Sequence, residues 1–159
     1  MGVVPPFTPN VAVTTSDLTW WANRPFAIYP AVSTALTAGA YSSVVWGTSS
    51  ISRDLVHSTS VNPERVYLNT AGWYEVMVLA VFSAGTTGYR RAVVQVSGTD
   101  AIVSQMNPTP SGSLSWAFCG YVRCTAPAQD YLTVQAYTSA GTGLTVTTSA
   151  RLSITFSGV

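Results

Sequence analysis

The 159-residue chain contains no lysine, and only 8% of its residues are charged, well below the roughly 25% that is usual for soluble domains. Seven arginines balance six acidic residues, so the formal net charge is +1. Nucleic-acid binding through counterion release needs clustered positive charge, and no such cluster is present. The adjacent Arg90 and Arg91 would point to opposite faces of a strand, so we expect no phosphate site there and no nucleic-acid partner.

Groups suited to catalysis or metal binding are scarce, because the chain has one histidine and two cysteines. His57 follows Asp54 and precedes Ser58 in a segment that we predict to be a loop, without the glycine-rich turn that presents a nucleophile. One histidine and two separated cysteines cannot form a zinc site, and only the loops of Asp100 and Asp130 offer calcium ligands. We therefore expect no enzymatic activity, no cofactor and no metal.

Long apolar runs are also missing, and none approaches the roughly 18 residues of a membrane helix. The first six residues, Met1–Pro6, lack the charged start of a secretory signal and contain two prolines. Cys119 and Cys124 lie in one predicted strand on opposite faces, about 16 Å apart, too far for a disulfide. We expect synthesis in the cytoplasm, no membrane insertion and free thiols.

The residues that are abundant in this chain favour β-strands. About a quarter of the residues are Ser or Thr, many of them interleaved with β-branched and aromatic residues. Turn residues bound strands expected near Phe26–Val32, Tyr41–Trp46, Arg65–Leu68, Trp73–Phe82, Tyr89–Val96, Ile102–Gln105, Leu114–Cys124, Tyr131–Tyr137, and Leu144–Phe156 with a bend. This pattern predicts an all-β, two-sheet jelly-roll sandwich of about ten strands.

The segment from Gly72 to Val96 carries the most information. Its two β-rich runs flank a Gly/Ser/Thr turn, which is a hairpin signal. In the first run both faces are apolar, with Trp73 and Met77 on one and Tyr74 and Val76 on the other, whereas the second run has one polar face. We infer one outer sheet and one sheet that needs cover on both faces, the second cover being most simply another subunit.

Four segments together resemble the tumour-necrosis-factor-like and complement-globular-head jelly roll across residues 26–159. They are Thr70-Ala71-Gly72-Trp73-Tyr74-Glu75-Val76, Thr87-Gly88-Tyr89-Arg90-Arg91, the run from Asp130 to Gly141, and Leu152-Ser153-Ile154-Thr155-Phe156. The resemblance implies a ten-strand jelly roll that assembles as a tight homotrimer. We expect its interface to include Trp73, Glu75, Met77, Trp116 and Arg151. A lone carboxylate in an apolar strand is costly, so Glu75 should meet Arg151 or another arginine, or line a hydrated channel on the trimer axis.

Residues 1–25 are predicted to be a docking arm, with a short helical turn capped by Thr15 or Ser16 and ended by Pro25. Pro6-Phe7-Thr8-Pro9, Val13–Leu18 and Trp20–Pro25 are similar to the starts of small virion proteins of tailed bacteriophages, especially minor tail proteins of phages that infect actinobacteria. The expected docking residues are Phe7, Leu18, Trp20, Trp21 and Arg24. The alternative is that both tryptophans pack on their own domain.

These expectations lead to a non-enzymatic bacteriophage virion structural protein, foremost a minor tail or tail-tip trimeric knob bound to other virion proteins. The alternatives are a capsid decoration or head-fibre protein and a carbohydrate-binding module. Tyr89, Tyr131 and Tyr137 are the expected contacts to a host cell-surface glycan, together with nearly uncharged turns whose binding would depend weakly on salt. Short solvated turns without a ligand remain the other interpretation of those loops.

Overall fold

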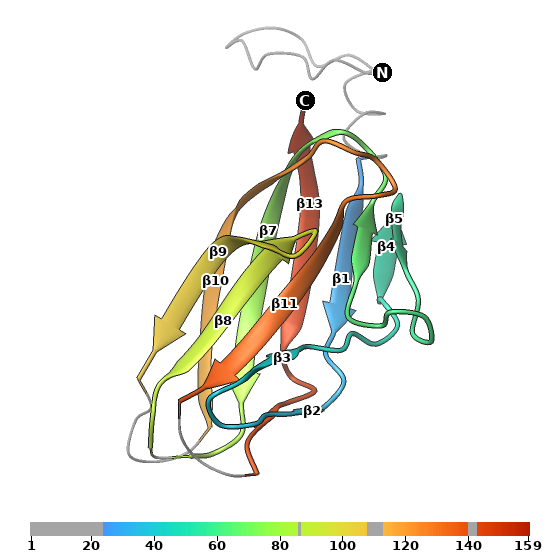
Figure 1. Cartoon of the computed structure of the whole chain (residues 1–159). Coiled ribbons are helices and arrows are strands. Elements are labelled where there is room, and N and C mark those ends of the chain that lie inside the picture. Colours follow the sequence, from blue (N-terminus) through green and yellow to red (C-terminus); the bar gives the residue numbers. More distant parts are fainter. Residues whose placement is uncertain (1–23, 86, 108–112, 140–142) are drawn as a thin grey trace, which may run out of the picture.

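The computed structural model describes residues 24–85, 87–107, 113–139 and 143–159, and its regular elements are all strands, arranged in two layers (Figure 1). The β7 sheet runs in the order β10 (Leu114–Cys124), β7 (Gly72–Phe82), β13 (Arg151–Gly158), β1 (Phe26–Pro30) and β4 (Ile51–Arg53), with β12 (Thr145–Val146) and β2 (Thr34–Ala35) beside the end of β7. The β11 sheet runs in the order β5 (Leu55–His57), β6 (Val66–Leu68), β11 (Tyr131–Thr138), β8 (Arg90–Val96) and β9 (Thr99–Met106), with β3 (Tyr41–Ser43) paired to β11. All pairings between the named strands are antiparallel, and the two layers confirm the predicted sandwich.

The core lies between the two sheets and follows the period-two pattern of the sequence. Along β7, burial alternates from Gly72 to Ala80, with Tyr74 and Val76 fully buried and Trp73 and Met77 exposed. These buried side chains form one cluster with those of the β11 sheet, including Leu132, Val134 and Ala92. The predicted two-sided character of β7 and one-sided character of β11 are confirmed.

The predicted hairpin between the two runs of Gly72–Val96 is wrong. β7 pairs with β10, β12 and β13, whereas β8 pairs with β11 and β9, so the two runs belong to different sheets. The segment after β7 leaves the sheet while Ser83 exchanges hydrogen bonds with Thr145, the Ser83 amide donating at 2.9 Å and its hydroxyl accepting at 2.9 Å. A linker rich in Gly and Ser is compatible with a crossing between layers as well as with a hairpin, because the chain has to change direction in both.

Arg90 holds this crossing in place from inside the molecule. Its side chain is 1% exposed, and its terminal nitrogens donate to the carbonyls of Thr87, Gly88 and Gly85 at 2.8, 3.2 and 3.4 Å. Desolvation lowers the pKa of the guanidinium. Arg91 points to the opposite face, as predicted for adjacent strand residues.

Several predicted strands differ from the structure by a few residues at their ends, and two segments differ by more than that. The expected bent strand Leu144–Phe156 is two strands, β12 and β13, separated by a turn in which the Ala150 amide donates to Thr147 at 3.1 Å. The segment around His57 is a strand rather than a loop. Asp54, with φ 56°, reverses the chain between β4 and β5, a left-handed conformation that aspartate tolerates better than most residues.

The two sheets meet along β9 and β10, where Trp116 lies in the core. Its ring stacks on Phe82 with centroids 5.2 Å apart, and its Nε1 donates to Ser104 of β9 at 3.0 Å. Trp116 is only 8% exposed and faces away from Trp73, so its expected place at a subunit interface is wrong. The alternation of β10 was predicted, but it does not reveal which of two apolar faces is the inner one.

Gly72 offers a test of the close packing at the start of β7. Its φ is +140°, and a Cβ there would lie 2.4 Å from the Gly158 carbonyl oxygen and 2.7 Å from the Phe156 ring. We expect Gly72→Ala to lower the free energy of unfolding by about 2–4 kcal/mol, measured by denaturant unfolding. Gly98→Ala is the control, because Gly98 has φ +86° with nothing within 4 Å, and it should cost only about 1 kcal/mol. Equal losses would contradict the packing argument.

Candidate functional site

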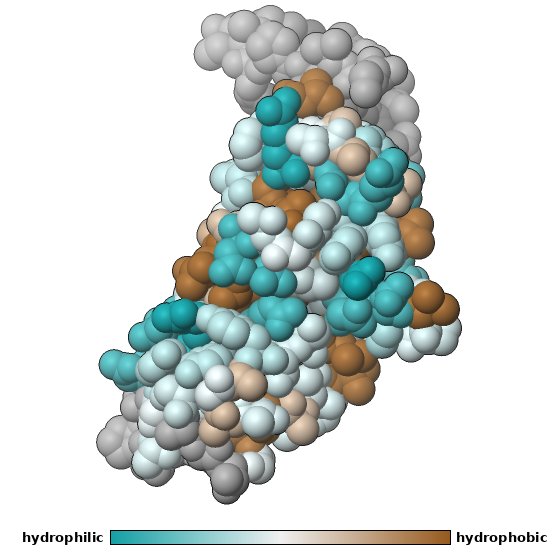
Figure 2. All heavy atoms as spheres, viewed as in Figure 1, coloured by the Kyte–Doolittle hydropathy of each residue, from teal (hydrophilic) through white to brown (hydrophobic). Residues whose placement is uncertain are grey.

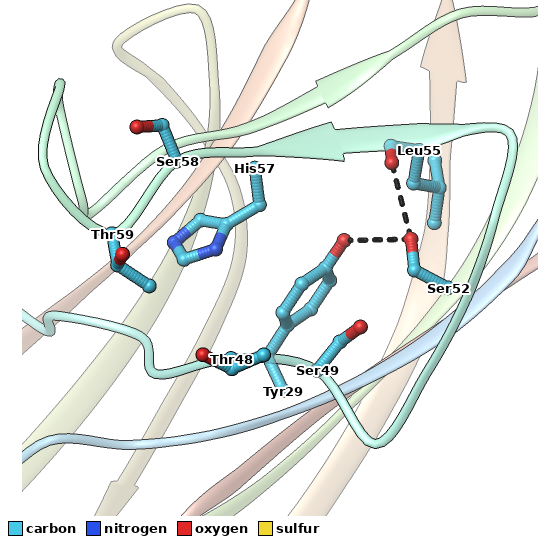
Figure 3. Close-up of a pocket in the computed structure, with 8 residues that line it drawn as sticks. All are labelled: Tyr29, Thr48, Ser49, Ser52, Leu55, His57, Ser58 and Thr59. Carbon is cyan, nitrogen blue, oxygen red and sulfur yellow. Dashed lines mark hydrogen bonds between the residues drawn. The ribbon is translucent and has the colours of Figure 1, made fainter.

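A pocket of about 370 Å³ opens between β1, β4, β5 and the loops beside them (Figure 3). It is lined by Tyr29, Thr48, Ser49, Ser52, Leu55, His57, Ser58 and Thr59. The rings of Tyr29 and His57 lie 5.0 Å apart, and Ser52 donates to the Leu55 carbonyl at 3.1 Å. Burial raises the pKa of the Tyr29 hydroxyl, so this hydroxyl is a neutral hydrogen-bonding group at physiological pH.

The groups around His57 do not form a catalytic triad. Its Nε2 lies 3.0 Å from the Pro63 carbonyl oxygen, which requires the proton on Nε2 and fixes the ring to its own backbone. The Ser58 hydroxyl accepts from the amides of Ser60 and Val61, and the Asp54 carboxylate accepts from Thr70. Within residues 24–85, where these groups lie, no hydroxyl bonds to His57 and no carboxylate orients it.

The carboxylates of the two aspartates considered as calcium ligands accept hydrogen bonds from neighbouring residues of the fold. Asp130 accepts four hydrogen bonds, from the amides of Thr125 and Ala126 and the hydroxyls of Thr125 and Ser97. Asp100 accepts from Gln95 at 2.8 Å. The part of the chain that the structure describes contains no group of three or more His, Cys, Asp or Glu that could hold a metal ion. The thiols are free as predicted, with Cys119 exposed and Cys124 buried.

On the outer face of the β7 sheet, the described part of the chain leaves a row of large apolar side chains exposed. Trp73, Met77 and Leu79 are 44%, 49% and 37% exposed along its central strand. Opposite Glu75 on β10, Tyr121 is 62% exposed. Large apolar side chains scattered singly on a surface are ordinary, but a contiguous row of them on a central strand marks an interaction site.

Glu75 lies in this row without the arginine that was expected for it. Among the described residues it forms no ion pair, and Arg151 instead donates to the carbonyls of Thr148 and Ala150. The register explains the difference, because Glu75 is opposite Thr155 whereas Arg151 is opposite Leu79, about 13 Å along the strand. Glu75 and Arg151 of one chain therefore do not pair, whereas an arginine of another copy or a hydrated channel on the trimer axis stays a prediction for Glu75.

The outer face of the β11 sheet carries five side chains that we call the Arg91 cluster: Tyr41, Tyr89, Arg91, Gln105 and Tyr137. Arg91 donates to Tyr41 at 3.0 Å and to Gln105 at 2.8 and 3.3 Å, and its guanidinium lies 5.6 Å from the centre of the Tyr89 ring. The Tyr137 ring lies 5.0 Å from Tyr41 and 5.5 Å from Tyr89. A hydrogen bond with Tyr89 is the main cause that raises the pKa of Tyr137.

Two of the three expected receptor tyrosines, Tyr89 and Tyr137, thus come together, and the third does not. Tyr131 lies six residues from Tyr137 on β11, about 20 Å away, under the guanidinium of Arg65 and beside Tyr67. Sequence reasoning missed Tyr41 and Gln105 because they join from β3 and β9. The only signal for Arg91 was its outward position on β8.

Figure 2 shows the molecule from the side of β8 and β11, with pale and teal side chains over most of this face. Polar contacts continue across it from the Arg91 cluster. Gln135 donates to Ser43 at 2.8 Å, and Thr133 donates to Gln95 at 3.2 Å. The central strand of the β7 sheet is therefore mainly apolar outward, apart from Glu75, whereas the outward face of the β11 sheet is mainly polar with aromatic rings.

The expected docking arm falls almost entirely outside the described residues. Phe7, Leu18, Trp20, Trp21 and the predicted helical turn lie there, whereas Arg24 is described and half-buried. The first strand begins at Phe26, as predicted, and the Phe156 amide donates to the Pro25 carbonyl at 2.9 Å. The described residues include no helix that is long and apolar enough to cross a membrane.

Comparison with solved structures identifies the fold. Two crystal structures of murine APRIL, at pH 8.0 and pH 5.0, superpose on this chain with TM-scores of 0.63 and 0.59 at 16% and 15% sequence identity. They match 84% and 83% of this chain and 99% of their own. The fold is a tumour-necrosis-factor-like jelly roll. No family model and no curated protein sequence matches the chain.

Asp130 gives this jelly roll a testable dependence on pH. Hydrogen bonds from the amides of Ala126 and Thr125 hold the pKa of Asp130 below its ordinary value, against a smaller opposing effect of burial. A carboxyl with a depressed folded pKa stabilises the protein above its unfolded pKa of about 3.9, and the contribution is lost as the pH falls through the folded pKa. We expect Asp130→Asn to lower stability at pH 7 and to flatten its decline below about pH 4.

Thermal unfolding between acidic and neutral pH measures this effect. Asp100→Asn is the matched control, since Asp100 accepts one hydrogen bond, from Gln95, and caps no turn. An unchanged pH profile for Asp130→Asn, or the same change in both variants, would contradict the role of the turn.

Proposed function

We propose that this chain is a non-enzymatic structural protein of a bacteriophage virion that acts by binding, as a jelly-roll homotrimer held on the particle by its N-terminal arm. The observation that carries the trimer is the exposed row of Trp73, Met77 and Leu79 on the central strand of the β7 sheet. Burying such a row is favourable at about 25 cal/mol per Å² of apolar surface. The resemblance of the fold to tumour-necrosis-factor-like jelly rolls supports the same assembly.

The charges on this face fit contact with another copy of the chain. Glu75 has no ion-pair partner among the described residues, while Arg123 lies over the Trp73 ring at 5.9 Å on the same face. A carboxylate enclosed by an interface needs a cation or water, and a neighbouring copy brings arginines from the same surface. The expected interface thus retains Trp73, Glu75, Met77 and Arg151 and omits Trp116.

The place on the particle is supported by the similarity of residues 6–25 to the starts of tailed-phage virion proteins. A minor tail or tail-tip position is the specific proposal, with the trimer displayed as a knob toward the host surface. Such a knob would be present in a few copies per particle, whereas a capsid decoration protein would be present in a number set by capsid symmetry. Quantitative mass spectrometry of purified particles distinguishes the two.

Assembly is tested by charge substitution on the apolar row. We expect the wild-type protein to have three times the chain mass in light scattering at micromolar concentration, with well over ~1,000 Å² buried per interface. Leu79→Arg should reduce this to a single chain mass, because it would bury an unpaired charge. Val103→Arg is the matched control, since Val103 is 55% exposed on β9 of the other sheet. A monomeric wild-type protein contradicts the proposal.

The arm is tested by deletion of residues 1–23, which keeps the Pro25 carbonyl that accepts from Phe156. We expect the shortened protein to remain a folded trimer, because the sheet begins at Phe26, and to be absent from particles when it replaces the full chain. Light scattering and mass spectrometry of particles measure the two outcomes. If the tryptophans instead cover their own domain, deletion will make the protein insoluble. Normal incorporation of the shortened protein would refute the docking role.

A further inference from the structure

Arg91 is held in one orientation by side chains of the neighbouring strands. Its Nε and Nη2 donate to Gln105 at 3.3 and 2.8 Å, and its Nη1 donates to Tyr41 at 3.0 Å. These bonds engage three of the five N–H groups of the guanidinium, so one N–H on each terminal nitrogen is left. Two such donors in one plane match the two oxygens of a carboxylate.

The charge of Arg91 is not balanced by the protein around it. Across the described ranges no carboxylate lies within ion-pair distance of Arg91, and Asp100 is engaged by Gln95. Arg65 provides an internal comparison, because it also lies over a tyrosine ring of the β11 sheet but pairs with Glu64 at 3.3 Å. A fixed arginine without a counter-ion is suited to an anion from outside.

The rings beside Arg91 define the rest of that ligand. Tyr89 and Tyr137 lie 26° from parallel, and Tyr41 is 47% exposed at the edge of the cluster. Such rings offer apolar faces together with hydroxyl groups, which suits the C–H faces and hydroxyls of a sugar. A single cation matches one negative charge per sugar, and a polymer without rings would leave the aromatic faces unused.

We propose that the Arg91 cluster binds an acidic saccharide, with Arg91 pairing with the carboxylate of a uronic acid and the tyrosine rings packing on its pyranose ring. This inference rests on the proposed role as a binding protein, but it does not require the trimer. It also changes the expected salt dependence. Binding through Arg91 weakens as salt increases, whereas the nearly uncharged loops alone would give little change.

The test uses the full-length protein with oligomers of galacturonic acid, glucuronic acid and alginate, and with the methyl ester of each. We expect at least one acid to bind about tenfold more tightly than its ester in calorimetry, because a hydrogen bond between two charged groups is stronger than one to a neutral ester. Arg91→Gln should remove this difference, and high salt should reduce it. Arg65→Gln is the matched control and should leave binding unchanged.

The outcomes separate clearly. Failure of all three acids to bind, equal binding of acid and ester, or retained preference in Arg91→Gln would overturn the proposal. Loss of binding in Arg65→Gln alone would show that the saccharide binds beside Tyr131 and Tyr67 rather than at the Arg91 cluster. If Arg91→Gln does not fold, Tyr41→Phe replaces it, since it removes one bond to Arg91 and should weaken binding severalfold. Light scattering on the same sample shows whether the trimer, rather than the saccharide site, has failed.

Discussion

The constraint on which this fold depends is that β7 is apolar on both faces. Its inward row, which includes Tyr74, Val76 and Phe82, is excluded from water only if a second sheet covers it, and burial of each large side chain contributes about 1.5–3 kcal/mol. The one charged side chain on β7, that of Glu75, points outward, so the inward row of this strand needs no ion pair. The outward row, which includes Trp73, Met77 and Leu79, is exposed among the residues that the structure describes. The same strand therefore defines both the sandwich and the surface at which we propose that another copy of the chain binds.

After β7 the chain crosses from one sheet to the other. Arg90 ties this crossing to the interior, since its buried guanidinium donates to the carbonyls of Gly85, Thr87 and Gly88. Its neighbour Arg91 then faces solvent by the alternation of the strand. Two consecutive arginines thus have opposite roles, one closing the interior and the other available for a ligand.

Alternation along single strands could be predicted from the sequence, and it correctly divided Trp73 from Tyr74 and Cys119 from Cys124. The pairing and register of the strands could not be predicted from it. The linker after Phe82 is compatible with a hairpin or a crossing, and only the pairing of β7 with β10 and β13, and of β8 with β9 and β11, decides between them. The distance of Glu75 from Arg151 depends on register, and the Arg91 cluster draws on β3, β8, β9 and β11, residues far apart in the chain. Such information is carried by tertiary packing rather than by local pattern.

The two outer faces become complementary once the trimer is considered. Assembly through the β7 sheet would leave the β11 sheet of every copy turned away from the interface, so each trimer would present three Arg91 clusters to solvent. A single site with one arginine and a few tyrosines binds a sugar weakly, but simultaneous contacts to one polymer can raise the overall affinity by about 10²–10⁴ without any new contact. Weak sites on a trimer suit a repetitive surface, because isolated sugars in solution would not compete with it. Under the proposed function, the apolar row would serve self-assembly and the polar aromatic face would serve display, as two parts of one binding function.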